Sequence, residues 1–120
     1  MRRVLIIDDS GFMKGYFEKF ASDVEVEQIY RLPDDESILA KYDALVVDGD
    51  GIGNKKYRHG LDFCKAYNKP EGQSVVYHSG LMALNEDAAE LEKRGIANVP
   101  KGGNPEKLVL AARFPMEKRQ

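Results

Sequence analysis

Short apolar runs alternate with segments of helical spacing along the whole chain. The runs at residues 4–7, 44–47 and 75–77 are almost entirely apolar and rich in β-branched side chains. Such runs indicate strands that are buried on both faces of a sheet. Residues 24–30 alternate between apolar and polar positions, which predicts a half-exposed strand at an edge, and residues 96–99 form a short last strand.

Helix signals occupy the segments between these strands. Capping residues, apolar residues at helical spacing, and glycines or prolines at the ends together predict five helices. We expect them after a cap at Ser10, within residues 33–41, over residues 61–67, from a cap at Asn85 to Gly95, and from Asn104 and Pro105 to Pro115. Residues 49–60, rich in glycine, indicate a loop.

The order is therefore strand then helix, repeated five times. Strands separated by helices pair in parallel with right-handed crossovers, and the helices cover both faces of the sheet. This predicts a three-layer α/β fold. A length of 120 residues suits one domain spanning residues 1–120.

Composition narrows the class of protein. Cys64, the single cysteine, cannot form an internal disulfide or a cysteine metal cluster. A net charge of −2 argues against nucleic-acid or membrane binding by charge alone. The chain opens without a signal-peptide pattern and holds no apolar run near the ~20 residues that a membrane span needs. We expect a cytoplasmic protein.

Polar residues stand at the ends of the expected strands. Asp8 and Asp9 follow the first strand, Asp48 the third, Ser79 the fourth and Lys101 the fifth. The carboxyl ends of parallel strands meet at one edge, where ligand sites form in open α/β sheets. These five side chains are therefore expected to lie together.

This set of groups suits phosphoryl transfer. Three neighbouring carboxylates repel one another, and a hard cation such as Mg²⁺ relieves that repulsion. A lysine ammonium and a serine hydroxyl can hold the oxygens of a phosphoryl group. Asp48, at the centre of the sheet, is then the natural nucleophile, forming an acyl phosphate.

The sequence resembles the receiver domains of two-component response regulators. The matching segments are residues 5–10 (LIIDDS), 43–48 (DALVVD), 75–80 (VVYHSG) and 99–101 (VPK), and the resemblance covers nearly the whole chain. It implies a flavodoxin-like (βα)5 fold with strand order 2-1-3-4-5. The resemblance implies Asp48 as phosphoacceptor; Asp9, Asp48 and the backbone carbonyl of Asp50 as metal ligands; Asp8 acting largely through water; and Ser79 and Lys101 binding the phosphoryl oxygens.

The resemblance also implies a function. A histidine kinase or a histidine phosphotransfer protein would phosphorylate Asp48 in the presence of Mg²⁺ or Mn²⁺. The output would be binding to an unknown downstream protein or transfer of the phosphoryl group along a phosphorelay, with no nucleic acid or membrane as partner. No output domain fits after Pro115, so we expect a stand-alone response regulator. It would be a signalling protein that catalyses at most its own phosphorylation and dephosphorylation, not an enzyme.

Four departures from the family pattern leave an alternative open. Loop 49–60 is longer than usual, and the segment between Tyr30 and Tyr42 leaves room only for a stunted helix. Pro100 precedes Lys101 instead of following it, and Asn98 stands where the family has an aromatic switch residue. The order Pro100-Lys101 and the absence of an aromatic residue at position 98 would remove the usual switch between a hydroxyl and an aromatic side chain. The alternative is a receiver-derived binding module that switches weakly or not at all.

Other interpretations of the motifs fit less well. An EF-hand beginning at Asp48 would place Ile52 and His59 at ligand positions, so it is excluded. A haloacid-dehalogenase-like phosphatase shares the pattern of Asp48 and Asp50, but its acidic pair follows the lysine, so it is the less favoured alternative. No Gly-Lys-Ser/Thr occurs, which excludes a Walker phosphate loop. We expect His78 to be structural and residues 55–59 to form a solvated basic loop, with a phosphate- or partner-facing patch as the alternative.

Overall fold

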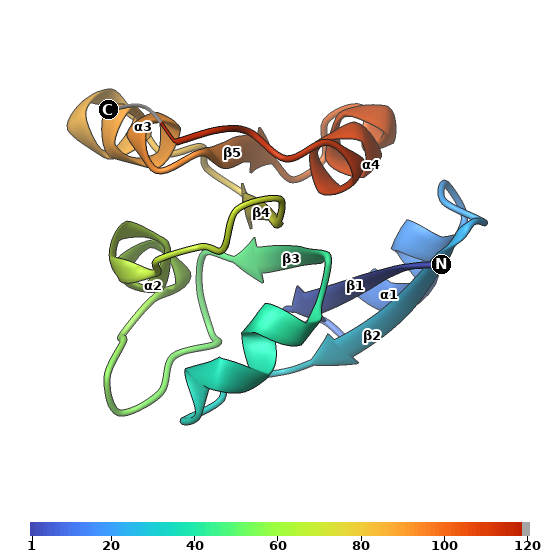
Figure 1. The fold of residues 1–120 in the computed structure, drawn as a ribbon, viewed down its shortest axis with the longest axis horizontal. Helices are drawn as coiled ribbons and strands as arrows, with labels where there is room; N and C mark the ends of the chain where they lie inside the picture. The colour runs from blue at the N-terminus through green and yellow to red at the C-terminus, as the bar shows by residue number, and fades with distance from the viewer. Residues whose placement is uncertain (119–120) are drawn as a thin grey trace.

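The computed structural model describes residues 1–118, which form a parallel sheet between two layers of helices (Figure 1). The elements, in chain order, are β1 (Arg2–Ile7), α1 (Met13–Glu18), β2 (Val24–Ile29), the 3-10 helix η1 (Glu36–Lys41), β3 (Ala44–Asp48), α2 (Gly60–Ala66), β4 (Ser74–Ser79), α3 (Asn85–Lys93), β5 (Ile96–Pro100) and α4 (Pro105–Arg113). None of the helices within residues 1–118 combines the length and the apolar character needed to cross a membrane.

The sheet has five strands in the order β2-β1-β3-β4-β5, which confirms the expected fold and strand order. All four strand pairs are parallel. The central strand, β3, pairs with β4 so that Asp48 lies opposite His78, and β4 pairs with β5 so that Ser79 lies opposite Pro100. The carboxyl ends of β1, β3, β4 and β5 therefore lie side by side.

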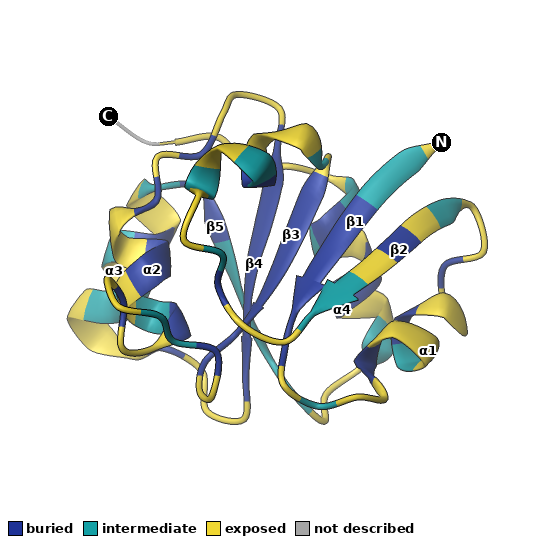
Figure 2. Ribbon diagram, turned by 90° about the horizontal axis from the view of Figure 1, so that it is seen from below, coloured by how far each residue is buried: buried dark blue, intermediate teal, exposed yellow. Residues whose placement is uncertain are grey.

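Two apolar layers, one on each face of the sheet, form the core. One layer includes Leu39 of η1, Phe63 of α2 and Leu91 of α3. The other includes Phe17 of α1 and Leu108 of α4. The central strands are buried on both sides while the outer faces of the helices are exposed (Figure 2). This double coverage explains the continuous apolar runs within β1 (residues 4–7), β3 (residues 44–47) and β4 (residues 75–77).

Two of the expected helix caps were wrong. Ser10 does not cap α1; its N–H instead donates to Asp8 Oδ1 at 2.8 Å, and Phe12 occupies the N-cap position. Asn85 is the first residue of α3 rather than its cap, and its φ of 53° lies in the left-handed region that asparagine tolerates. Asn104 does cap α4, because its side chain accepts a hydrogen bond from the N–H of Glu106.

A buried side chain connects three elements on the face that carries α2. Gln73 donates through Nε2 to the carbonyl oxygens of Leu39, at 2.8 Å, and Tyr42, at 3.0 Å. Its Oε1 accepts from the hydroxyl of Tyr67 at 2.8 Å. Gln73 thus joins η1 and the chain after α2 to the start of β4, and it provides partners for polar groups that water does not reach.

Replacing this glutamine should destabilise the fold. Gln73→Met keeps the side-chain volume but leaves the buried Tyr67 hydroxyl and the Tyr42 carbonyl without a partner. We expect a loss of about 1–3 kcal/mol in the free energy of unfolding, measured by urea denaturation. Tyr67→Phe removes one of the three hydrogen bonds and should cost less. A loss for Gln73→Met no larger than that for Tyr67→Phe would contradict this role.

Candidate functional site

Three carboxylates meet at the carboxyl end of the sheet. Asp8 and Asp9 follow β1, and Asp48 ends β3. One oxygen from each carboxylate lies within 4.8 Å of the others. Asp8 is 1% exposed and Asp48 is 6% exposed, whereas Asp9 is open to solvent. The structure thus brings the three acidic residues of the predicted site together.

Lys101 joins this cluster from the end of β5. Its Nζ lies 2.8 Å from Asp48 Oδ1, to which it donates a hydrogen bond, and 3.0 Å from Asp8 Oδ2. Its backbone N–H donates to the carbonyl of Ser79 at 2.7 Å, which fixes the lysine next to the end of β4. One ammonium therefore contacts two buried carboxylates. The structure thus places Lys101 beside the acids, as the sequence predicted.

Burial is the main electrostatic influence on Asp48. It raises the pKa of the Asp48 carboxyl above its ordinary value, since it penalises the charged form; the hydrogen bond from Lys101 opposes this rise, and the charges of Asp8 and Asp9 add to it. Burial alone would lower the pKa of Lys101, but its hydrogen bond to Asp48 and its ion pair with Asp8 raise it overall. The ammonium thus keeps its charge at neutral pH.

The segment after β1 is held by a residue on β2. Gln28 donates from Nε2 to the carbonyl oxygens of Asp8, at 2.9 Å, and Ser10, at 2.7 Å. Its Oε1 accepts from the N–H of Lys14 at 2.8 Å. Gln28 therefore orients both the acidic pair and the start of α1. The sequence signal was weak, because a glutamine on an edge strand resembles a solvent-facing residue.

Ser79 ends β4 beside Gly49, whose role the sequence alone does not reveal. A Cβ atom on Gly49 would lie 2.4 Å from Ser79 Oγ and 2.8 Å from the Tyr77 hydroxyl. Gly49 therefore allows the chain after Asp48 to pass against both hydroxyls, and a larger residue would displace them. Ser79 is itself 7% exposed, so its hydroxyl has a defined position at the edge of the site.

A second glycine lets the same loop approach Asp9. Gly51 has a φ of 79°, and a Cβ placed on it would lie 2.2 Å from Asp9 Oδ2. Asp50, between the two glycines, points its side chain into solvent, where it is 89% exposed and lies 3.6 Å from His59 Nδ1. The expected role of its backbone carbonyl stays a prediction.

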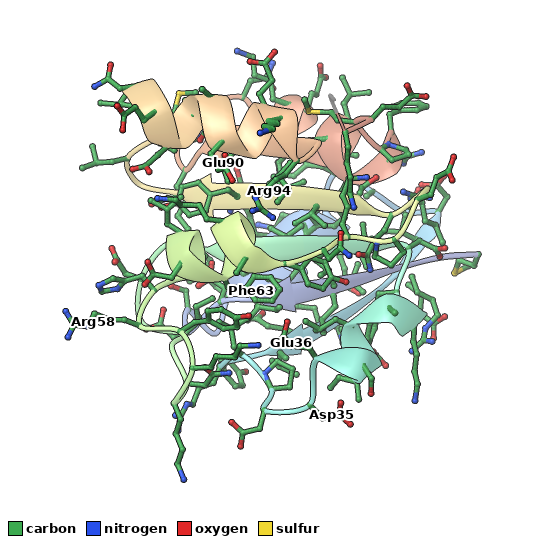
Figure 3. All side chains as sticks on the ribbon, turned by 60° about the vertical axis from the view of Figure 1, so that its left-hand side comes forward. Asp35, Glu36, Arg58, Phe63, Glu90 and Arg94 are labelled. Atoms are coloured by element: carbon green, nitrogen blue, oxygen red, sulfur yellow. The ribbon has the colours of Figure 1, made fainter. Side chains whose placement is uncertain are left out.

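The rest of loop 49–59 is ordered by contacts with the neighbouring chain. Ile52 is fully buried, and its carbonyl accepts from the N–H of Leu32 at 2.8 Å. Asn54 Oδ1 accepts from the N–H of Tyr57 at 2.8 Å, which makes a turn of the basic segment. Arg58 extends outward from this loop into solvent (Figure 3).

His78 lies beside the cluster as a neutral side chain. It is 5% exposed, and burial lowers its pKa to about 4, with the nearby ammonium of Lys101 acting in the same direction. Its Nδ1 has no hydrogen-bond partner among residues 1–118. At neutral pH it therefore adds no positive charge to a site that already holds the lysine.

Asn98 clasps the loop that follows Ser79. Its Oδ1 accepts from the N–H of Ala83 at 3.0 Å, and its Nδ2 donates to the carbonyl of Ala83 at 2.8 Å. This paired contact between a β5 side chain and the backbone before α3 holds the loop against the sheet. The departure from the family pattern noted at Asn98 thus places a polar clamp in this part of the structure.

The acidic cluster is suited to a divalent cation. Asp8 Oδ2 is buried and accepts no hydrogen bond from any residue between 1 and 118, and its partner is the lysine ammonium at 3.0 Å. Carboxylate oxygens that close together are the donors that Mg²⁺ and Ca²⁺ prefer. The cluster can therefore bind a hard cation.

Removing the charge of Asp48 should stabilise the metal-free protein. The pKa of Asp48 is higher in the folded protein than the value of 3.8 in the unfolded chain. Ionising Asp48 therefore lowers the free energy of unfolding as the pH rises above 3.8, until the folded-state pKa is passed. We expect Asp48→Asn in EDTA to have a higher Tm than wild type at pH 7, with the difference shrinking as the pH falls towards 3.8. The exposed Asp34→Asn is the control and should leave Tm unchanged. A clear fall in Tm for Asp48→Asn at pH 7 would contradict the electrostatic account.

Comparisons with known proteins give a match in structure rather than in sequence. No protein-family model matches the chain, and no curated protein sequence matches it. The chain is similar in structure to a receiver domain protein (CheY-like) from Methanospirillum hungatei JF-1, with a TM-score of 0.68 and 19% identity, covering 92% of this chain and 89% of that one. It is also similar to the signal receiver domain of a putative Luxo repressor protein from Vibrio parahaemolyticus, with a TM-score of 0.69 and 18% identity, covering 92% and 87%.

A third similar structure contains groups at its own site. It is a response regulator protein from Burkholderia pseudomallei with a phosphorylated aspartic acid, calcium ion and citrate, with a TM-score of 0.66 and 19% identity. The match covers 93% of this chain and 66% of that protein, so this chain spans about two thirds of its length. The order of the strands and the similarity to these structures together show that the chain has the fold of response regulator receiver domains.

Proposed function

We propose that residues 1–120 act as a receiver domain of two-component signalling, which accepts a phosphoryl group on Asp48 from a histidine kinase or a histidine phosphotransfer protein. The observation that carries the proposal is the contact of the Lys101 ammonium with both Asp48 and Asp8, beside Ser79, at the end of the central strand. A buried pair of acids bridged by one lysine serves poorly as a structural ion pair but well as a phosphoryl site.

In this proposal the two oxygens of Asp48 have different roles. Lys101 binds Oδ1, which leaves Oδ2 as the nucleophile. Oδ2 attacks the phosphorus atom, a P–O bond forms, and the bond between phosphorus and the donor breaks, with its electron pair leaving on the donor. The donor atom is a histidine nitrogen in a kinase, or an oxygen in acetyl phosphate.

Two side chains would then hold the new phosphoryl oxygens. Lys101 can move from the Asp48 carboxylate to a phosphoryl oxygen, because the charge it partners has moved outward onto that group. The Ser79 hydroxyl can donate to a second oxygen from the end of β4. The backbone bond between these two residues, at 2.7 Å, keeps their spacing fixed during the step.

We propose Mg²⁺ (or Mn²⁺) as the cation at this site, held by Asp8, Asp9, Asp48 and the backbone carbonyl of Asp50, with Asp8 acting through water. The cation would neutralise charge on the transferring phosphoryl group. The acids would in turn orient it and exclude a second anion from the site.

The output in this proposal is a signal rather than a chemical product. The domain catalyses at most its own phosphorylation and dephosphorylation, and it passes the signal to a downstream protein or along a phosphorelay. We propose no nucleic acid or membrane as partner. Because histidine kinases phosphorylate their response regulators inside the cell, we place the domain in the cytoplasm.

Acetyl phosphate provides a direct test. With Mg²⁺ present, intact-protein mass spectrometry should show one added phosphoryl group on the wild type, stable in acid and lost in base. Asp48→Asn should show none, EDTA should abolish the addition, and Ser79→Ala should slow it. The control Asp34→Asn should react like wild type. An adduct that persists in Asp48→Asn would sink the assignment, and repeated turnover of a small phosphate ester would indicate a phosphatase instead.

The Asn98 clamp favours a second candidate function, a receiver-derived module that binds a partner without switching. Two hydrogen bonds hold the backbone of Ala83 to β5. A loop that is fixed in this way has less freedom to follow a change at Ser79 than a loop that packs against a rotating aromatic ring. Phosphorylation would then leave α3 and its surroundings unaltered.

Beryllofluoride separates the two candidates. A switching receiver should show amide shift changes that extend from the site into α3 and α4 when Mg²⁺ and beryllofluoride are added. A passive module should show changes confined to the site. If the wild type shows only local shift changes, Asn98→Ala, which removes the clamp, should extend them to α3 and α4. Shift changes that stay local in Asn98→Ala would show that the clamp does not limit switching.

A further inference from the structure

A cavity lies at the end of the sheet opposite Asp48. Its lining consists of Lys69, Glu71, Gly72 and residues 115–118, and its volume is about 570 Å³. Lys69 and Gly72 precede β4, and the chain after α4 passes Gly95 at the start of β5. Because all strands are parallel, these are the amino ends of the strands, and Figure 2 shows the C-terminal tail at that end. We call this cavity the basal pocket.

The basal pocket contains a buried ammonium group with too few partners. Lys69 is 4% exposed, and within the described part of the chain its Nζ donates one hydrogen bond, to the carbonyl of Gln73 at 3.0 Å. A lysine ammonium has three N–H donors, so two have no partner among residues 1–118. Among residues 1–118, no carboxylate forms an ion pair with it. Buried lysines are ordinarily paired.

The charges and apolar groups around Lys69 determine which kind of anion could bind to it. Burial lowers the pKa of Lys69, the charge of Lys118 lowers it further, and the carboxylates of Glu71 and Glu117 raise it. Glu71 and Glu117 also line the cavity, and their negative charges oppose a doubly charged anion more strongly than a singly charged one. Pro115 and Met116 provide apolar lining for a carbon skeleton.

The position of the lysine is fixed by tight packing. A Cβ on Gly95 would lie 2.9 Å from Lys69 Cε and 2.7 Å from the carbonyl oxygen of Met116. The lysine stem thus runs between the start of β5 and the C-terminal tail. Lys118 is tied to Asn68 Oδ1 by a 2.7 Å hydrogen bond, so it is partly satisfied without a ligand.

We propose that the basal pocket binds the carboxylate of a small monoanionic organic acid, with Lys69 as its ionic partner. The carboxylate takes the two free N–H donors of the ammonium, and the carbon skeleton lies against Pro115 and Met116. The volume lies within the range of small-molecule sites, so acids considerably larger than acetate fit. This proposal is independent of chemistry at Asp48.

Propionate is the probe that tests the proposal. In ¹⁵N-labelled protein, propionate should give saturable amide shifts at Gly72 and Gly95, with a dissociation constant on the order of 1–10 mM. Lys69→Met preserves the length of the side chain and should abolish the shifts. The matched control Lys107→Met, which changes an exposed lysine outside the lining, should retain them. Asp48→Asn should bind as wild type does, which separates this site from the phosphoryl site.

Two further measurements keep the proposal falsifiable if Lys69→Met does not fold. In wild-type protein, propionate should raise the pKa of Lys69, followed through its Cε resonance, because a bound anion stabilises the ammonium. Inorganic phosphate, mostly dianionic above neutral pH, should bind more weakly than propionate. Absence of saturable shifts, shifts that survive in Lys69→Met, an unmoved Lys69 pKa, or phosphate binding as tight as propionate binding would each overturn the proposal.

Discussion

The contact of one ammonium with two buried acids is the interaction on which the candidate site depends. Asp8 and Asp48 end adjacent strands of a parallel sheet, so the topology itself forces two charges of the same sign together. Neither can reach solvent freely, and repulsion between them would oppose folding. Lys101 offsets that repulsion from the end of β5, and its backbone is in turn bonded to Ser79.

This arrangement connects the stability of the fold with its chemistry. A lysine that only balanced charge could sit anywhere near the acids, but here it is at the edge of the sheet where a phosphoryl group would arrive. The same contact that keeps the acids together in the absence of a ligand is therefore the one that would be exchanged during transfer. The burial that raises the pKa of Asp48 also strengthens each electrostatic interaction at the site, because less water screens it.

Much of this could be predicted from the sequence, and the exceptions have physical reasons. Continuous apolar runs identify strands buried on both faces, and their carboxyl ends bring Asp8, Asp48 and Lys101 together whatever the details of the loops. Capping was harder to predict, since Ser10 and Asn85 have backbone roles that depend on hydrogen bonds and dihedral angles that sequence does not specify. Gln28 and Asn98 were not predicted as positioning residues, because an amide acquires a partner only through tertiary contacts.

The two ends of the loop after Asp48 lie next to each other. The N–H of Gly60 donates to the carbonyl of Gly49 at 3.0 Å, and a Cβ on Gly60 would lie only 1.8 Å from the carbonyl oxygen of Asp48. Residues 49–60 therefore form a loop whose two ends, Gly49 and Gly60, are held together by a backbone hydrogen bond. Because its two ends are fixed to each other, the length of this loop need not affect the position of Asp48 at its base. The exposed tip at Lys55 and Lys56 is then the part of this loop where foreign sequence could be inserted.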